Sequence, residues 1–332
     1  MATERVLHMK GGEGETSYIK NSLLQRKVGS IVKPILEDNV KLLMSNITSE
    51  SCWKVADLGC SSGTNSLLFV SNMLSLMDSA SLSLNQSTPP VLQIYMNDLF
   101  GNDFNIIFKL IPDFLEGIHE EKNENHGRCF IHATPGNFYG RLFPDDYIHF
   151  FHSSYSLHWL SQAPTSTNIV EPLNKGNVYI TSDNPPSVYE AYLKQFEKDF
   201  KLFLKSRSEE LRSGGIMLLT FIGREKSQDM TTPWGLIGTV LNDMVQEFRL
   251  LCLLSFMGLY MLWRKFKRWG LLMFGWNVIL LWFVLRLLLG LMFLGCFVFD
   301  EILVLITVGK SGLGLLIENL FIGIIGYHLV CS

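Results

Sequence analysis

An acidic residue followed by two glycines is the first chemical signal in this sequence. Asp57 comes just before Gly59 and Gly63, where an apolar run leads into a turn and then into a helical pattern. Glycines at such a turn let a ligand approach the backbone at the carboxyl end of a strand. The spacing is neither G-x-G-x-x-G nor a P-loop, which disfavours nicotinamide and ATP. It suits S-adenosylmethionine, which carries no phosphate groups.

A second acidic residue lies where a bound nucleoside needs one. The next apolar run along the chain ends in Asn97 and Asp98. An aspartate at such a strand tip is placed to accept hydrogen bonds from both ribose hydroxyls. A generic strand–turn–helix unit with a capping aspartate explains either feature alone. Together, the two features favour S-adenosylmethionine as the cofactor.

Alternating strands and helices are expected to position these residues. This order predicts an α/β fold with a doubly wound sheet. The polar, glycine-rich residues 1–30 and the segments 79–90 and 117–128 are predicted loops, and Pro34 is tolerable in the first turn of a helix. The predicted strands are Lys54–Cys60, Val91–Asn97, Cys129–Ala133, Tyr147–Ser153, Gly176–Thr181 and Ile216–Ile222, and the predicted helices are Ile31–Asn46, Ser66–Asp78, Asp103–Leu115 and Ser187–Leu211.

The composition excludes several classes of protein. The chain has 332 residues, of which 48% are hydrophobic and 18% charged, and its formal net charge is −3. These values exclude a disordered chain, a collagen-like chain and a basic nucleic-acid-binding protein. The cysteines form no C-x-x-C pair, which argues against a disulfide framework or a zinc site. No apolar signal segment is visible at the N-terminus, so a cytoplasmic location is expected.

Five segments closely resemble the plant SABATH methyltransferases, which include salicylate, benzoate and jasmonate carboxyl methyltransferases and the N-methyltransferases of the caffeine pathway. They are 6–18 (VLHMKGGEGETSY), 21–25 (NSLLQ), 97–105 (NDLFGNDFN), 136–144 (GNFYGRLFP) and 152–162 (HSSYSLHWLSQ). The resemblance extends from the first residues to about Glu247. It implies a Rossmann-like class I methyltransferase sheet with a helical cap, and S-adenosyl-L-methionine as the cofactor.

The resemblance also implies which residues contact the cofactor. The family usually has Ser at the position of Asn137 and Pro at the position of Thr64. Asn137 can still donate and accept hydrogen bonds, so a contact with adenine remains expected there. The implied cofactor-binding residues are Tyr18, Asp57, Cys60, Asn65, Asp98, Leu99, Asn137 and Phe138, with Lys10 close by.

The methyl acceptor is expected to lie against a second set of residues. Their implied members are Gln25, Tyr155, His158, Trp159 and Trp234, and Asn174 matches one ligand of a magnesium site found in some family members. Without the resemblance, Tyr155 and Trp159 could equally be core aromatics and His158 a structural histidine. His152 is interpreted as structural.

A carboxylic acid acceptor is consistent with these residue types. With a pKa of about 4, it is ionised at neutral pH and needs no general base. Alignment with an activated methyl donor can supply roughly 7–11 kcal/mol, so no side chain is predicted to act as an acid, a base or a nucleophile. Gln25 and the indole N–H of Trp159 can hold a carboxylate. Within the resemblance, His158 disfavours strict salicylate specificity but does not choose between a carboxylate and a purine nitrogen.

The resemblance ends where the composition changes. Every proline lies at or before Pro233, and only three acidic residues follow Glu247. The apolar run Leu271–Phe299 is long enough to span a bilayer, and a basic cluster precedes it. An out-of-frame translation is the preferred interpretation, because re-spelling codons around Tyr260 in another frame yields an acidic sequence closer to the family's cap. Under either interpretation, the cap's pocket walls and magnesium ligands have no counterparts here.

The sequence therefore predicts three parts. These are an arm (1–30), an S-adenosylmethionine-binding domain (31–247) and an anomalous apolar tail (248–332). The expected activity is transfer of a methyl group to a small aromatic or jasmonate-like acid. The alternatives are N-methylation of a xanthine and an inactive member with a disrupted cap. A homodimer is implied by the family, no nucleic acid partner is expected, and membrane association is expected only if the tail is real.

Overall fold

The computed structural model describes most of the chain up to residue 247 and one strand beyond it. The described residues are 9, 11–12, 14–15, 17–47, 51–86, 88–122, 129–164, 180, 184–223, 238, 240–247 and 301–308. The predicted strand Gly176–Thr181, apart from one residue, lies outside this set. So do Lys10, Asn174 and Trp234 and nearly all of the predicted tail.

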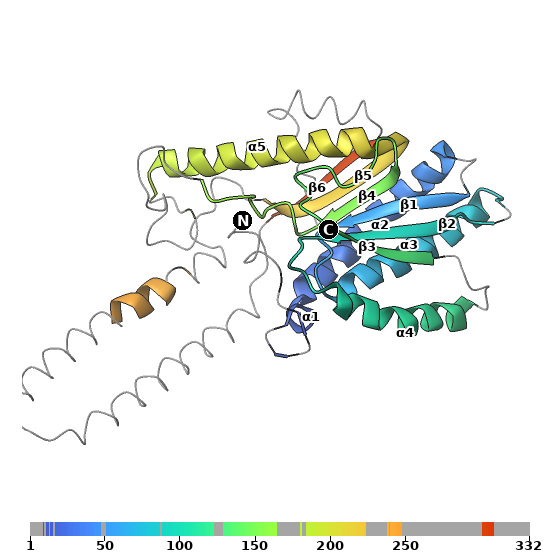
Figure 1. Cartoon of the computed structure of the whole chain (residues 1–332), viewed down its shortest axis with the longest axis horizontal. Helices are drawn as coiled ribbons and strands as arrows, with labels where there is room; N and C mark the ends of the chain where they lie inside the picture. The colour runs from blue at the N-terminus through green and yellow to red at the C-terminus, as the bar shows by residue number, and fades with distance from the viewer. Residues whose placement is uncertain are drawn as a thin grey trace, which may run out of the picture. The chain divides into compact units, whose positions relative to one another are not determined.

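The described strands form one six-stranded sheet in the order β3-β2-β1-β4-β5-β6 (Figure 1). The pairings of β1 with β2, β1 with β4, β2 with β3 and β4 with β5 are all parallel. Because β2 and β4 flank β1, the order of winding reverses there, which is where open α/β sheets bind ligands. The strands are β1 (Cys52–Leu58), β2 (Val91–Asp98), β3 (Cys129–Pro135), β4 (Ile148–Ser154), β5 (Leu211–Gly223) and β6 (Glu301–Val308).

Helices cover both faces of this sheet, which confirms the predicted α/β fold (Figure 1). On one face, Val40 and Met73 belong to the same buried cluster as Trp53 of the sheet. On the other face, Phe203 packs in a cluster with Phe151. Complete burial of such side chains contributes about 1.5–3 kcal/mol each. The helices are α1 (Tyr18–Asn21), α2 (Leu23–Asn46), α3 (Thr64–Ser83), α4 (Phe104–Lys122) and α5 (Pro186–Glu210).

Helix α2 begins at Leu23, so the prediction of a loop throughout residues 1–30 and a helix from Ile31 is wrong. Buried Val28, Val32 and Leu36 recur every four residues and form one apolar stripe, which requires the additional turns. Pro34 consequently lies inside the helix rather than in its first turn. Its ring is exposed, so water can replace the missing backbone donor.

Other element boundaries differ for the same reason, namely burial beyond the predicted ends. Helix α3 continues to Ser83 through the predicted loop because Ala80 is completely buried. Helix α4 continues to Lys122, and β5 already begins at Leu211, which is also completely buried. In each case the tertiary contacts outweigh the weak local preference of polar or short segments.

Strand β6 was not predicted, although its sequence, EILVLITV, is rich in β-branched residues. It lies next to β5 at the edge of the sheet. Asp300 precedes this strand and Gly309, Lys310 and Ser311 follow it, so turn residues at both ends could have marked it, but the segment was interpreted as part of the apolar tail. The rest of the tail is outside the described residues, so its interpretation stays a prediction.

The chain divides into two compact units. The first comprises Met1–Gln162, Lys194–Ile222 and Ile302–Ser332, and the second comprises Ala163–Leu193 and Gly223–Glu301. All of the site residues described below belong to the first unit. In the second unit, residues 240–247 are helical. Within the part of the chain that the structure describes, no helix is both long and apolar enough to cross a membrane.

Candidate active site

The turn after β1 has a backbone that requires glycine at one position. Gly59 has a φ of +81°, and a Cβ there would lie 2.0 Å from the Oγ of Ser156. Ser61 also has a positive φ, +58°, which costs a residue other than glycine roughly 1–2 kcal/mol. In this conformation its N–H donates to Oδ2 of Asp98 at 2.7 Å. The strained turn is therefore tied to the end of β2.

Further hydrogen bonds from the end of β2 fix the same turn. The Nδ2 of Asn102 donates to the carbonyl of Ser61 at 2.8 Å. The carbonyl of Asn97 accepts the N–H groups of both residues that follow β1, at 2.9 Å each. The other oxygen of Asp98 accepts the N–H of Leu99 at 2.8 Å. These bonds bring the glycine turn and the aspartate at the strand tip together, as the sequence predicts.

A cavity of about 280 Å³ opens beside this turn. Helices α1, α2 and α3 and the carboxyl ends of β1, β4 and β5 contribute its walls. Five of the predicted site residues line it, namely Tyr18, Gln25, Asp57, Cys60 and Asn65. The cavity therefore gathers four predicted cofactor residues and one predicted acceptor residue, whereas its lining does not include Asp98, Leu99, Asn137 and Phe138.

Asp57 is held by a histidine that sequence reasoning assigned a structural role. The Nδ1 of His152 lies 2.7 Å from Oδ1 of Asp57, and both side chains line the cavity. A carboxylate can only accept, so Nδ1 carries the hydrogen of this bond. The ring of Phe69 stacks on the imidazole with centroids 4.0 Å apart, which fixes the ring plane. Oδ1 of Asp57 is therefore engaged with His152, while Oδ2 takes no part in this bond.

Tyr18 and Cys60 are neutral groups on the wall of the cavity. Burial raises the pKa of Tyr18, with smaller contributions from the nearby carboxylates of Asp57 and Asp98 and an opposing hydrogen bond to Asn65. Burial also raises the pKa of the Cys60 thiol well above its usual value. A thiol held in its protonated form is not a nucleophile.

The loop between β3 and β4 borders the turn from the other side. The Nδ2 of Asn97 donates to the carbonyl of Gly136 at 3.0 Å. The ring of Phe138 comes within 3.8 Å of a Cβ built on Gly59. The Oδ1 of Asn137 accepts the N–H of Tyr139 at 3.0 Å, so this side chain stabilises its own loop. Phe138 is therefore close to the cofactor turn, while Asn137 keeps its amide N–H groups for other partners.

The predicted acceptor residues form a separate aromatic group. The rings of Tyr155 and His158 meet edge to face with centroids 5.9 Å apart, and the ring of Trp159 lies 6.1 Å from that of His158. Burial lowers the pKa of His158 to about 4. Trp159 is 43% exposed. None of the three is among the residues that line the cavity.

Two of the predicted acceptor residues, Gln25 and His158, have buried polar atoms without a hydrogen-bond partner among the described residues. Within the described part of the chain, neither Oε1 of Gln25 nor Nδ1 of His158 has a hydrogen-bond partner, although both atoms are buried. Buried polar atoms are normally paired, so these two atoms are available for a hydrogen bond with a bound molecule. Trp234 and Asn174 cannot be placed. No cluster of three or more His, Cys, Asp or Glu side chains suited to a metal occurs among the described residues.

Sequence reasoning missed several residues that position the site. Ser61, Asn97 and Asn102 supply the hydrogen bonds around the turn, and His152 orients Asp57. Buried asparagines directly beside Asp98 could have been noticed, because a polar side chain at a strand tip needs partners. The pairing of His152 with Asp57 had no sequence signal, because it depends on the register of β1 against β4.

The family model for SAM dependent carboxyl methyltransferases matches residues 4–250. The chain belongs to this family. A probable caffeine synthase of Coffea canephora is 47% identical over 252 residues, which cover 74% of this chain and 66% of that protein. Salicylate carboxymethyltransferase of Clarkia breweri is 45% identical over 251 residues, which cover 74% of this chain and 67% of that protein.

A solved methyltransferase structure shares the architecture of this chain. Loganic acid methyltransferase, determined with S-adenosylhomocysteine (SAH), superposes with a TM-score of 0.60 and 31% identity. The match covers 72% of this chain and 67% of the other. The chain thus matches about two thirds of the length of its relatives. The family assignment confirms the predicted resemblance, cofactor class and fold.

The described residues fit S-adenosylmethionine. The cavity places the carboxylate of Asp57 in the same space as the cations of Arg26 and Lys33, which suits a ligand end that carries both an ammonium and a carboxylate. Asp98 lies at the strand tip, where an acid suits ribose hydroxyls. The ring of Phe138 offers an aromatic surface beside the turn.

Proposed function

We propose that the chain transfers a methyl group from S-adenosylmethionine to the carboxylate of a small acid and thereby forms a methyl ester. The observation that carries this proposal is the position of Gln25, whose amide N–H₂ can donate to a carboxylate, on the wall of the cavity that also holds predicted cofactor residues. Burial also lowers the pKa of His158 to about 4, which makes it a weak proton acceptor. An ionised carboxylate needs no proton acceptor, whereas an N–H group must lose its proton. When bound, the cofactor supplies an activated methyl group that a carboxylate can take directly.

The cofactor is proposed to lie along the carboxyl ends of β1 and β2. Asp98 accepts from its ribose, Phe138 and Asn137 border its adenine, and Leu99 lies beside them. Asp57 receives its ammonium group, while Tyr18, Cys60 and Asn65 enclose its amino-acid end. The support is the shared cavity and the hydrogen bonds that join the turn to the tip of β2.

The acceptor is proposed to lie between Gln25 and the aromatic group of Tyr155, His158 and Trp159. The support is the position of Gln25 on the cavity wall, where its amide N–H₂ can donate to a carboxylate. The three rings suit a planar apolar acid. Trp234 is proposed as a further wall, and Asn174 as a ligand of a magnesium ion.

A xanthine nitrogen is the second candidate acceptor. The similarity to a caffeine synthase favours it, because that protein is as similar to this chain as the salicylate enzyme is. A neutral imidazole at position 158 can also hydrogen-bond to a purine. A homodimer, a cytoplasmic location and an inactive chain with a disrupted cap stay predictions.

One experiment separates these candidates. Purified full-length protein is incubated with methyl-labelled S-adenosylmethionine and with salicylate, benzoate, jasmonate, loganate or a monomethylxanthine, and the products are extracted and identified. We expect a labelled methyl ester from at least one acid. A labelled N-methylxanthine alone would replace the proposal with the second candidate. Binding of SAH without turnover on any acceptor would establish the inactive member.

A further inference from the structure

A completely buried ion pair lies at the end of α5, outside the cavity. Arg207 and Glu210 are both 0% exposed, and the Nε of Arg207 donates to Oε2 of Glu210 at 2.8 Å. Removing two charges from water costs several kcal/mol per ion, so a buried pair contributes little net stability. Apolar side chains of similar volume would fill the same space at lower cost. The remaining hydrogen bonds of the pair indicate what else it does.

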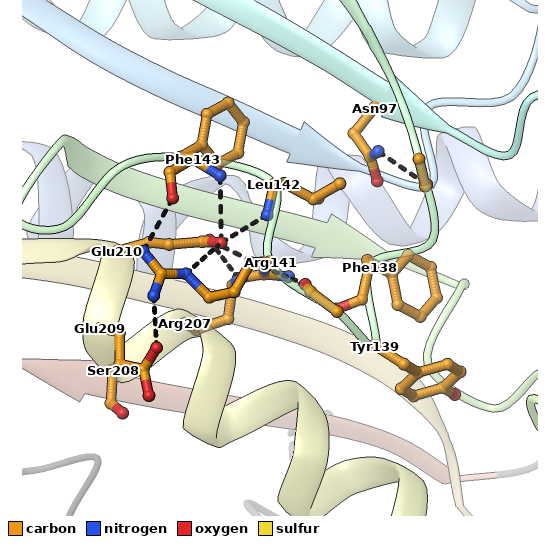
Figure 2. A network of polar contacts seen from close by, with 12 residues as sticks. Asn97, Phe138, Tyr139, Arg141, Leu142, Phe143, Arg207, Ser208, Glu209 and Glu210 are labelled. Carbon is orange, nitrogen blue, oxygen red and sulfur yellow. Dashed lines mark hydrogen bonds and ion pairs between the residues drawn. The ribbon is translucent and has the colours of Figure 1, made fainter.

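Both members of the pair bind the backbone of one loop (Figure 2). The two terminal nitrogens of Arg207 donate to the carbonyls of Phe138 and Gly140, at 2.8 Å each. Oε1 of Glu210 accepts the N–H groups of Leu142 and Phe143, at 2.6 and 3.1 Å. Four backbone groups in a six-residue stretch, 138–143, are thereby fixed by one ion pair. Only the planar fork of a guanidinium can serve a carboxylate and two carbonyls at once.

A second arginine, Arg141, pairs with the carboxylate of Glu210 from the exposed side. The Nε of Arg141 lies 3.3 Å from Oε1 of Glu210, and its terminal nitrogens bind Glu209 and Asp145. One of these nitrogens also donates to the carbonyl of Phe143 at 3.0 Å. Since Arg141 is 41% exposed, its ion pairs are screened by water and weaker than the buried pair.

The loop that is held in this way is the one that borders the cofactor turn. Its first residue, Gly136, is bonded to Asn97 at the end of β2, and the ring of Phe138 reaches Gly59. The ring of Phe138 also meets that of Phe203 of α5 edge to face, with centroids 5.9 Å apart. The loop therefore has two anchors, one at the tip of β2 and one at the end of α5.

We propose that the Arg207–Glu210 pair positions the loop 136–143 as the wall of the nucleoside-binding part of the site, so that Arg207 sets the affinity for the cofactor. This inference rests on the proposed function, because the wall is assigned to adenine. Arg207 is a positioning residue here, since it acts through the carbonyls of Phe138 and Gly140. The pair itself contacts none of the described residues assigned to the acceptor, although the hydroxyl of Tyr139 in this loop donates to the carbonyl of Trp159 at 2.6 Å. The acceptor site is therefore expected to change less than the cofactor site.

The test is Arg207→Lys, which keeps a charge opposite Glu210 but cannot bind both carbonyls as well. We expect the Kd for SAH, measured by titration calorimetry on the full-length protein, to rise about tenfold. The KM for S-adenosylmethionine should rise similarly, while kcat and the acceptor KM stay within twofold of wild type. Lys201→Met on the exposed side of α5 is the matched control and should change none of these values.

A merely structural role gives a different result. In that case Arg207→Lys lowers the thermal midpoint and the active fraction, while the folded protein binds SAH as tightly as wild type does, and the proposal is overturned. If Arg207→Lys does not fold, Glu210→Gln serves the same purpose, because it keeps an acceptor for the loop but loses the charge. An unchanged Kd in folded Glu210→Gln would equally overturn the proposal. Failure of the wild type itself to bind SAH would instead refute the proposed function.

Discussion

The two halves of the candidate site are built from different interactions. In the cofactor half, the turn after β1, the end of β2 and the loop after β3 are joined by hydrogen bonds that mostly involve the backbone. In the acceptor half, Tyr155, His158 and Trp159 meet through their rings. Buried polar atoms without a partner among the described residues occur in both halves, for example Oε1 of Gln25 and Oδ1 of Asn102.

This difference indicates how the two halves recognise their ligands. A backbone-directed network is rigid before the ligand arrives, so the cofactor half holds one molecule with little reorganisation. A group of contacting rings depends on the identity of each side chain, so its shape can be altered by one substitution at a time. The cofactor half is therefore expected to be common to the family, and the acceptor half to carry specificity. Four measurements test this contrast.

The largest effect is expected from Asp98→Ala. Loss of two charge-assisted hydrogen bonds to ribose, at about 1.5 kcal/mol each, predicts a roughly 100-fold higher Kd for SAH. Calorimetric titration measures this value. The exposed Asp113→Asn on α4 should bind SAH like wild type. If Asp98→Ala binds SAH within threefold of wild type, the ribose assignment is wrong.

The next effect concerns the stability of the acceptor half. Burial lowers the pKa of His158 to about 4 in the folded chain, whereas in the unfolded chain it stays near 6.5. As the pH falls below about 6.5, the imidazole is therefore protonated in the unfolded chain before it is protonated in the folded chain. The contribution of His158 is complete above pH 6.5 and declines towards pH 4, by about 2 kcal/mol at pH 5. Urea unfolding at pH 7.5 and pH 5 measures it. His158→Gln should lose less stability on acidification than wild type.

His132→Gln, at an exposed position on β3, is the control for this pH effect. It should lose as much stability on acidification as wild type does. Equal losses in wild type and His158→Gln would mean that the imidazole at position 158 is accessible to protons in the folded protein. The argument for a carboxylate acceptor would then lose its basis.

A smaller effect, on acceptor binding alone, is expected from Gln25→Leu. Loss of one hydrogen bond to a carboxylate predicts about a tenfold higher acceptor KM, with an unchanged KM for S-adenosylmethionine. Steady-state kinetics with each substrate varied in turn measures both. Ser45→Ala, exposed further along α2, is the control. If both KM values rise equally, Gln25 contributes to cofactor binding as much as to acceptor binding.

The smallest effect is expected from His152→Phe. The new ring can still stack on Phe69, but Asp57 loses the hydrogen bond that orients it. We expect about a fivefold higher Kd for SAH, which corresponds to about 1 kcal/mol. His152→Asn, which retains a donor, should recover part of the affinity. If both variants bind like wild type, His152 is structural, as the sequence suggested.

The sequence by itself determined the family, the parallel α/β sheet and the position of the cofactor turn. These follow from local features, because periodic apolar runs, the glycine turn and Asp98 lie close together along the chain or at successive strand ends. The start of α2 was misplaced, because the buried stripe Val28–Leu36 needs a partner surface that the sequence does not show. Strand β6 was missed because its residues were interpreted as part of the apolar tail, although Asp300 and Gly309 flank it.

Only the tertiary structure decided which distant residues act together. The register of β1 against β4 places His152 beside Asp57, and the end of α5 brings Arg207 and Glu210 to the backbone of the loop 138–143. Each of these pairings joins residues far apart in the sequence, and none leaves a local pattern. Composition and periodicity report which faces are buried, but only the packed sheet and helix fix which buried polar groups meet.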